Sequence, residues 1–318
     1  MHFPIHGGVF YRQIGTVYAV DGVSFSIEPG KTLGLVGESG CGKSTIGRTL
    51  VGLYQATDGQ VVFQDQNIAQ LPRKTLKNLR ADVQMIFQDP YESLNPRHTV
   101  GEILAEPFII HRQMSVAQRN QQVLALLDRV GMPADAVHKY PHEFSGGQRQ
   151  RIGIARAVAL HPKLIVCVEP VSALDVSIQS QILNLLLELQ QEMGMAYLFI
   201  AHDLAVVKHV SDQIAVMYLG RIVEIADSED IYRSPLHPYT QALLSAIPMP
   251  DPRQRRRFEP LPGEVPSPIN PPPHCHFVDR CAYATDRCRT ETPQLRNIAD
   301  QADSHQVACH FAGEVSTS

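Results

Sequence analysis

The chain has 318 residues, 44% of them hydrophobic and 19% charged, and its 28 Lys and Arg are slightly outnumbered by 32 Asp and Glu. This is enough for one large globular domain and an appendage. The net charge of −4 argues against a general nucleic-acid binder, which needs a concentrated excess of basic residues. No window approaches about 18 uninterrupted apolar residues, so we expect no membrane span. The first residues lack the pattern of a secretory signal, so we expect none.

Short apolar runs alternate with helical patterns up to about residue 250. Because strands separated by helices form mainly parallel sheets covered on both faces, this order predicts an α/β fold. Residues 99–162 carry helical patterns without a convincing strand, which predicts a helical insert. The expected strands are 32–36, 83–87, 164–168, 197–201 and 213–217, and the expected helices include 43–53, 118–130, 148–160 and 177–193.

The composition shifts after about residue 250 towards Pro, Arg and Cys. We expect residues 251–273, which contain many prolines and a basic run at 253–257, to form a linker with solvated charges. The predicted division is a domain over 1–250, with a helical subdomain at about 89–162, followed by a Pro-rich linker and a Cys-rich C-terminal domain over 251–318.

The segment 37–45 reads Gly-Glu-Ser-Gly-Cys-Gly-Lys-Ser-Thr, follows a predicted strand and opens a predicted helix. In this context the pattern G-x-x-x-x-G-K-[ST] binds nucleotide phosphates. Its glycines let backbone N–H groups converge on phosphate oxygens at a helix N-terminus. Lys43 is expected to reach the β and γ phosphates, and Ser44 to ligate Mg²⁺. The candidate ATP-binding residues of this loop are Gly37, Ser39, Gly40, Cys41, Gly42, Lys43, Ser44 and Thr45.

A phosphate-binding loop does not identify the class of NTPase, and four further motifs narrow the choice. They are Phe87-Gln88-Asp89-Pro90-Tyr91, Phe144-Ser145-Gly146-Gly147-Gln148-Arg149-Gln150-Arg151, Glu169-Pro170-Val171-Ser172-Ala173-Leu174-Asp175 and His237-Pro238-Tyr239-Thr240-Gln241-Ala242-Leu243-Leu244. With these motifs the chain resembles the ATP-binding subunits of ABC transporters, and most of all the ATPase subunits of bacterial dipeptide and oligopeptide importers. The resemblance covers nearly the whole chain. It implies a P-loop NTPase core with a parallel sheet, an antiparallel edge subdomain, a helical insert and a small Cys-rich C-terminal appendage.

The resemblance also implies catalytic roles for residues outside the loop. Gln88 would sense Mg²⁺ and the attacking water, Glu169 would act as general base, and His202 would touch the γ-phosphate. An aromatic residue near the N-terminus would stack on adenine. Phe3 fits that role best, and Tyr11 is the alternative.

A second anion-binding device is formed by Ser145-Gly146-Gly147 at the start of a predicted helix. The resemblance implies that it closes, together with Gln148 and Asp175, on ATP held by the loop of a partner. One loop and one such signature supply two half-sites, so a dimer is implied.

One position departs from the family pattern. The family has an aspartate just before the glutamate, and this chain has Val168 before Glu169. The aspartate orients Mg²⁺ or its water, and valine offers neither an oxygen ligand nor a charge. The hypothesis is that ATP still binds here while Mg²⁺ positioning and hydrolysis are impaired. Compensation by neighbouring groups, or an engineered or erroneous residue, are the alternatives.

Four of the six cysteines gather near the C-terminus, namely Cys275, Cys281, Cys288 and Cys309. Disulfides, buried free thiols and a metal centre are the competing interpretations. An ATP-using chain works in a reducing compartment, which disfavours disulfides, and four thiols in a poorly apolar segment favour a ligand set for zinc or an iron–sulfur cluster. The family resemblance favours a [4Fe–4S] cluster.

These patterns together predict an ATP-binding subunit that couples ATP binding and hydrolysis to uptake of di- and oligopeptides, with ATP and Mg²⁺ as cofactors. The implied partners are a homologous second ATPase, two transmembrane permease subunits and a periplasmic peptide-binding protein, with no nucleic acid. The implied location is the cytoplasmic face of the inner membrane. A non-hydrolysing regulatory subunit and a soluble ABC ATPase of translation or repair are the alternatives. Nickel complexes and glutathione stay open as substrates beside peptides.

Overall fold

One sheet of eight strands organises the chain, in the order β11-β12-β10-β9-β3-β8-β7-β6. The computed structural model describes residues 1–247, 261–298 and 305–314. The strands from β6 to β9 run parallel, whereas β10, β12 and β11 each pair antiparallel with their neighbour. This confirms the predicted parallel core. The strands are β3 (Thr32–Val36), β6 (Val83–Ile86), β7 (Leu164–Val168), β8 (Ala196–Ala201), β9 (Gln213–Tyr218), β10 (Arg221–Asp227), β11 (Arg296–Asn297) and β12 (Gln306–Val307).

Helices cover both faces of this sheet. Helix α1 (Lys43–Leu50) packs on one face, while α7 (Val176–Met193) and α8 (Leu204–Val210) pack on the other. Because strand side chains alternate between the faces, Ile165 and Cys167 of β7 join the cluster that includes α7. Val166 and Val168 join the cluster that includes α1.

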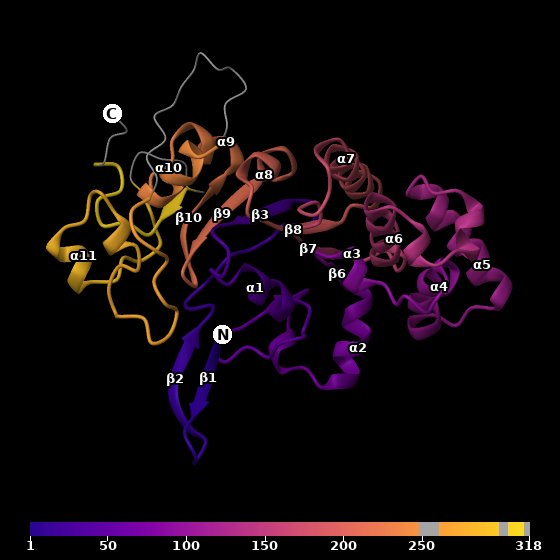
Figure 1. Cartoon of the computed structure of the whole chain (residues 1–318), viewed down its shortest axis with the longest axis horizontal. Helices are drawn as coiled ribbons and strands as arrows, with labels where there is room; N and C mark the ends of the chain where they lie inside the picture. The colour runs from indigo at the N-terminus through magenta and orange to yellow at the C-terminus, as the bar shows by residue number, and fades with distance from the viewer. Residues whose placement is uncertain (248–260, 299–304, 315–318) are drawn as a thin grey trace.

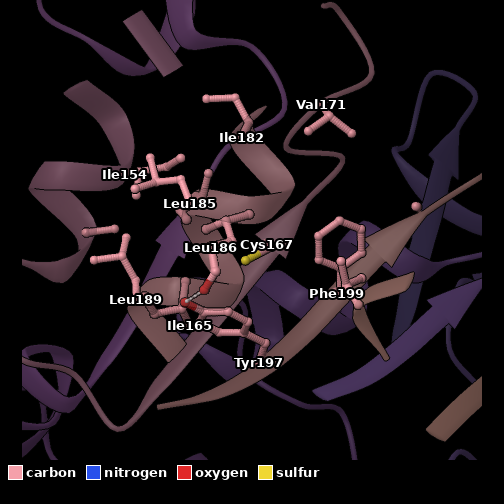
Figure 2. Close-up of a cluster of buried hydrophobic side chains, with 14 of the residues drawn as sticks. Ile154, Ile165, Cys167, Val171, Ile182, Leu185, Leu186, Leu189, Tyr197 and Phe199 are labelled. Atoms are coloured by element: carbon pink, nitrogen blue, oxygen red, sulfur yellow. Dashed lines mark hydrogen bonds between the residues drawn. The ribbon is translucent and has the colours of Figure 1, made fainter. Parts of the chain in front are cut away.

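Figure 2 shows the α7 side of the core. Side chains of α7 lie over Ile165, Cys167, Tyr197 and Phe199 of the neighbouring strands β7 and β8. The hydroxyl of Tyr197 donates to the carbonyl oxygen of Leu186 at 2.9 Å, so the one polar atom of this ring is satisfied inside the core. This packing fixes α7, and with it the loop between β7 and α7, over the sheet.

A helical layer follows β6 in the chain and lies to one side of the sheet (Figure 1). It confirms the predicted helical insert. Three of its α-helices begin with capping boxes, at Thr99 with Glu102, Ser115 with Gln118, and Ser145 with Gln148. Its elements are α3 (Pro90–Ser93), α4 (Val100–His111), α5 (Val116–Arg129), η2 (Ala134–His138), η3 (Pro141–Glu143) and α6 (Gly146–Val158).

The antiparallel part near the N-terminus is built from short elements. The hairpin of β1 (His2–Gly7) and β2 (Arg12–Tyr18) projects from the body of the molecule (Figure 1). The predicted linker contributes to it, because Val17 of β2 forms a bridge with Ile269. The remaining elements here are β4 (Val62–Phe63), β5 (Gln66–Asn67), η1 (Ile68–Gln70) and α2 (Arg73–Asp82).

The C-terminal segment joins the main sheet rather than standing apart from it. Glu224 of β10 pairs with Val307 of β12, and Phe277 lies buried against Tyr218 and Tyr239. The basic run at 253–257 lies outside the described residues. The elements of this part are α9 (Ser228–Arg233), α10 (Pro238–Ser245), η4 (Val278–Arg280) and α11 (Asp286–Thr290).

The predicted element boundaries differ from the observed ones by a few residues. Strand β6 ends at Ile86, one residue before the predicted end, and α1 ends at Leu50 rather than at residue 53. No helix among the described residues is both long and apolar enough to cross a membrane.

Candidate functional site

The phosphate-binding loop between β3 and α1 takes the shape that its glycines allow. Gly37, Gly40 and Gly42 have positive φ angles of 152°, 81° and 108°, which side chains disfavour. A Cβ on Gly42 would lie 2.0 Å from the carbonyl oxygen of Ala19, and one on Gly37 would lie 2.1 Å from that of Met217. Close backbone contacts therefore exclude a side chain at either glycine.

Lys43 begins α1 and lies buried in this loop. Its Nζ donates to the carbonyl oxygens of Gly37 at 2.7 Å and Glu38 at 2.9 Å. Ser44 and Thr45 follow in the first turn of the helix, where the helix dipole adds partial positive charge. A cation and a helix N-terminus in one loop favour a bound phosphate. Burial raises the pKa of the Cys41 thiol, which makes it a neutral packing group.

Gln88, Glu169 and His202 come together at the carboxyl ends of neighbouring strands. Oε2 of Glu169 accepts a hydrogen bond from Nε2 of Gln88 at 3.1 Å and lies 3.2 Å from Nδ1 of His202. The backbone of Glu169 has a φ of 45°, and its N–H donates to the carbonyl oxygen of Ile200 at 2.8 Å. Since β3 neighbours β8, the phosphate loop leaves the same edge of the sheet. The three predicted catalytic residues therefore form one cluster at that edge.

Val168 is the last residue of β7, on the face that carries α1. It lines a cavity of about 770 Å³ together with Ser44 and Gln88, the two candidate Mg²⁺ ligands. A carboxylate at this position would face that cavity. Valine at position 168 supplies no oxygen ligand of the kind that Mg²⁺ prefers.

The predicted signature lies at the N-terminus of α6. The exposed Ser145 accepts from the backbone N–H of Gln148 at 3.3 Å, and the Gln148 side chain accepts from the N–H of Ser145 at 3.0 Å. A Cβ on Gly147 would lie 2.6 Å from Cγ2 of Ile178, so only glycine allows α6 to approach α7 this closely. Asp175 is the N-cap residue of α7. The signature and Asp175 are thus held by two helices that pack against each other.

The two aromatic candidates for adenine stacking lie in the projecting hairpin. Phe3 packs edge-to-face on Tyr54, with ring centroids 5.7 Å apart. Tyr11 is 76% exposed near the hairpin tip and stacks on His6 at 4.9 Å. Adenine stacking by either ring stays a prediction.

The four C-terminal cysteines, Cys275, Cys281, Cys288 and Cys309, are free thiols that line one cavity of about 20 Å³. Burial raises the pKa of Cys275 to about 11 and also raises the pKa values of Cys281 and Cys309, which favours the protonated form of these thiols. Metal ligation needs thiolates. In the described ranges, no three or more His, Cys, Asp and Glu side chains are arranged to hold a metal ion. The four cysteines thus converge on one cavity, and a metal centre at them stays a prediction.

Two residues to which the sequence analysis assigns no role in the site also reach the phosphate loop. Arg280 pairs with the carboxylate of Glu38, and the hydroxyl of Tyr239 accepts a hydrogen bond from the backbone N–H of Glu38 at 2.9 Å. Local patterns cannot signal the Arg280 contact, because Arg280 and Glu38 lie 242 positions apart in sequence.

Comparison with known families gives two matches along the chain. Residues 20–172 match the ABC transporter family, and residues 223–288 match the oligopeptide/dipeptide transporter C-terminal region. The first match contains the phosphate loop and the signature, and the second contains Arg280 and three of the four C-terminal cysteines.

Individual relatives match almost end to end. The chain is 53% identical to the oligopeptide transport ATP-binding protein AppF of Bacillus subtilis, covering 98% of this chain and 94% of the relative. It is 51% identical to OppF of Escherichia coli, covering 97% and 93%. It is 49% identical to the di/tripeptide transport ATP-binding protein DppF of Pseudomonas aeruginosa, covering 98% and 95%.

Solved structures agree with this comparison. A dimeric ATP-binding cassette in a post-hydrolysis state, bound to ADP and Pi, superposes with a TM-score of 0.63 at 28% identity, covering 68% of this chain and 94% of that one. The cbiO1 subunit of a Clostridium perfringens ABC transporter complex gives 0.62 at 27% identity, covering 68% and 84%.

Proposed function

The chain belongs to the ABC transporter family of ATP-binding proteins, and we propose that it is the ATPase subunit of an importer of di- and oligopeptides. The observation that carries this proposal is that an ATP-binding loop and a C-terminal region similar to that of peptide transporters share one chain. Bound peripherally to permease subunits at the cytoplasmic face of the inner membrane, the chain would turn ATP-driven closure into movement of the permeases.

The proposed site needs a second ATPase subunit to be complete. Lys43 and its loop hold the phosphates of one ATP, and the exposed Ser145 at the start of α6 meets the γ-phosphate of the ATP held by the partner. We infer that the partner is a homologous second ATPase and that a periplasmic peptide-binding protein delivers the substrate.

Peptide uptake by membrane vesicles holding the assembled importer tests the transport function. Lys43→Ala is expected to abolish uptake of a labelled tripeptide, because closure needs ATP bound at both half-sites. Lys163→Ala, at an exposed lysine, is the control. If nickel complexes or glutathione reduce uptake of the labelled tripeptide and unlabelled peptides do not, the proposed substrate class of di- and oligopeptides is wrong. If the chain does not co-purify with permeases, a soluble ATPase of translation or repair is favoured instead.

Hydrolysis is proposed to be unequal between the two sites. The trio of Gln88, Glu169 and His202 is in place, but Val168 puts no carboxylate at the end of β7, just before Glu169. ATP therefore binds at the loop of this chain, and most hydrolysis occurs at the site formed by the partner's loop and Ser145.

A [4Fe–4S] cluster at the four cysteines, with zinc as the alternative, is the finer part of the proposal. Its support is that all four thiols line one cavity. Metal analysis of the chain purified without oxygen tests it. About four irons with absorbance near 400 nm indicate a cluster, and stoichiometric zinc indicates the alternative. If neither metal is found, the thiols are packing groups.

A further inference from the structure

A bidentate ion pair joins the C-terminal segment to the phosphate loop. Nη1 of Arg280 lies 2.7 Å from Oε2 of Glu38, and Nη2 lies 3.1 Å from Oε1. The side chain of Arg280 is only 7% exposed and that of Glu38 is 27% exposed. Two parallel hydrogen bonds between a guanidinium and a carboxylate fix their relative orientation as well as their distance. The pair therefore sets the position of residue 38.

Glu38 is also held through its backbone. Its N–H donates to the hydroxyl of the buried Tyr239 at 2.9 Å. Its carbonyl oxygen accepts from Nζ of Lys43 at 2.9 Å and from the N–H of Cys41 at 3.3 Å. Residue 38 thus connects the C-terminal segment to the lysine that would meet phosphate. It occupies a position at which the phosphate-binding motif specifies no residue.

Contacts within the C-terminal half of the chain also hold Arg280 in place. Its Nε donates to the carbonyl oxygen of Pro262 at 3.3 Å, and its guanidinium carbon lies 5.9 Å from the ring centroid of Tyr218. Tyr218 packs in turn on Phe277, three residues before Arg280, with ring centroids 5.2 Å apart. The hydrogen bonds to Glu38 raise the pKa of Arg280, which keeps it charged. The packed rings of Tyr218 and Phe277 therefore hold a permanently charged guanidinium against the loop.

We propose that Arg280 is a positioning residue of the ATP site, through which the C-terminal segment holds the phosphate loop in its binding shape by the paired carboxylate of Glu38. Without this pair the loop must be ordered when ATP binds, and the ordering cost weakens binding. The proposal rests on ATP binding at this loop and not on the substrate that is transported. A chain that binds ATP normally but imports no peptide contradicts the import function alone.

The test uses the full chain and the assembled importer with Arg280→Gln, Arg280→Lys and Glu38→Gln. Arg287→Gln is the matched control, because Arg287 forms an exposed ion pair with Glu291 at 2.9 Å in the same segment. We expect Arg280→Gln to raise the dissociation constant of MgATP about tenfold, with a smaller rise for Arg280→Lys, which keeps the charge but loses the fork. The KM for ATP is expected to rise while kcat holds, and Arg287→Gln is expected to change neither.

Three further results separate positioning from simple structural support. The double variant of Glu38→Gln with Arg280→Gln is expected to bind MgATP about as weakly as either single variant, because both break one interaction. If Arg280→Gln lowers the melting temperature and leaves the dissociation constant unchanged, the pair is structural only and the proposal is wrong. If Arg280→Gln does not fold, Glu38→Gln breaks the same pair from the loop side, and unchanged MgATP affinity in that variant overturns the proposal.

Discussion

Nδ1 of His202 lies 3.2 Å from Oε2 of Glu169, and the same oxygen accepts a hydrogen bond from Gln88. The base that would activate water is thus oriented from two sides. One residue earlier, Val168 faces the cavity shared by Ser44 and Gln88. The base is in place while the expected metal ligand beside it is missing, and this contrast leads to the first prediction.

Val168→Asp is expected to raise ATP turnover at this chain's own site about tenfold or more, because a carboxylate there supplies an oxygen for Mg²⁺. Turnover is measured in an importer whose partner site has been inactivated. Val168→Asn is the matched control, since it adds a polar group of similar size without the charge. Equal turnover with valine and aspartate would show that neighbouring groups already position the metal.

The effect of losing Glu169 is expected to depend on residue 168. With Val168 in place, Glu169→Gln is expected to lower ATP turnover at this site only slightly, because hydrolysis there is already slow. With Val168→Asp, the same change is expected to remove the turnover that was gained, about a hundredfold or more, if Glu169 is the general base. The measurement is single-site ATP turnover of the four combinations. Additive effects would contradict a shared step.

Ser145 and Ser115 offer a test of the signature with a built-in control. Both cap helices through the same capping box, with Gln148 and Gln118, so each change to Ala is expected to cost about 1 kcal/mol of unfolding free energy. Only Ser145→Ala is expected to lower ATP turnover of the whole importer, by about tenfold or more, because its hydroxyl would meet the partner's γ-phosphate.

The two serine variants are compared by thermal unfolding and by turnover of the assembled importer. Equal loss of turnover for Ser115→Ala and Ser145→Ala would mean that helix stability, rather than contact with nucleotide, explains the effect.

The sequence predicts those parts of the fold that local patterns encode. The loop at Gly37–Lys43 and the start of α6 carry turn and capping signals within a few residues, and both form as expected. The short strands β11 and β12 have two residues each, too few for a period to be recognised, and they form because β12 pairs with β10 across the chain. The pair of Glu38 and Arg280 was not predicted for the same reason, since tertiary packing alone brings the two together.

The four cysteines show the opposite case, in which composition suggests more than the geometry provides. Their clustering in sequence predicts a shared ligand set, and in the fold all four thiols line one cavity. A metal site further needs thiolates within bonding distance of one point, and burial raises the pKa of Cys275, which opposes the thiolate form. Spacing in sequence contains neither the charge state nor the final distance.

The last prediction concerns pH and the buried His237 at the start of α10. Its Nδ1 accepts a hydrogen bond from the backbone N–H of Tyr239 at 3.0 Å. The backbone N–H of His237 donates to the buried carboxylate of Glu224, which also binds His305. Burial lowers the pKa of His237 from 6.5 to about 4, against the attraction of Glu224. The unfolded chain therefore takes up this proton more readily than the folded one. The contribution of the neutral His237 to the free energy of unfolding is complete above pH 6.5. It falls as the pH drops towards 4, by about 3 kcal/mol in all.

His237→Asn tests this origin, because asparagine keeps an acceptor for the N–H of Tyr239 and cannot be protonated. Denaturant unfolding between pH 4.5 and 7.5 gives the slope of unfolding free energy against pH for both chains. We expect a shallower slope in the variant, whatever its absolute stability. His276, whose pKa is also lowered by burial, contributes equally to both chains and leaves a residual slope. Parallel curves for the two chains would assign the acid sensitivity to other groups.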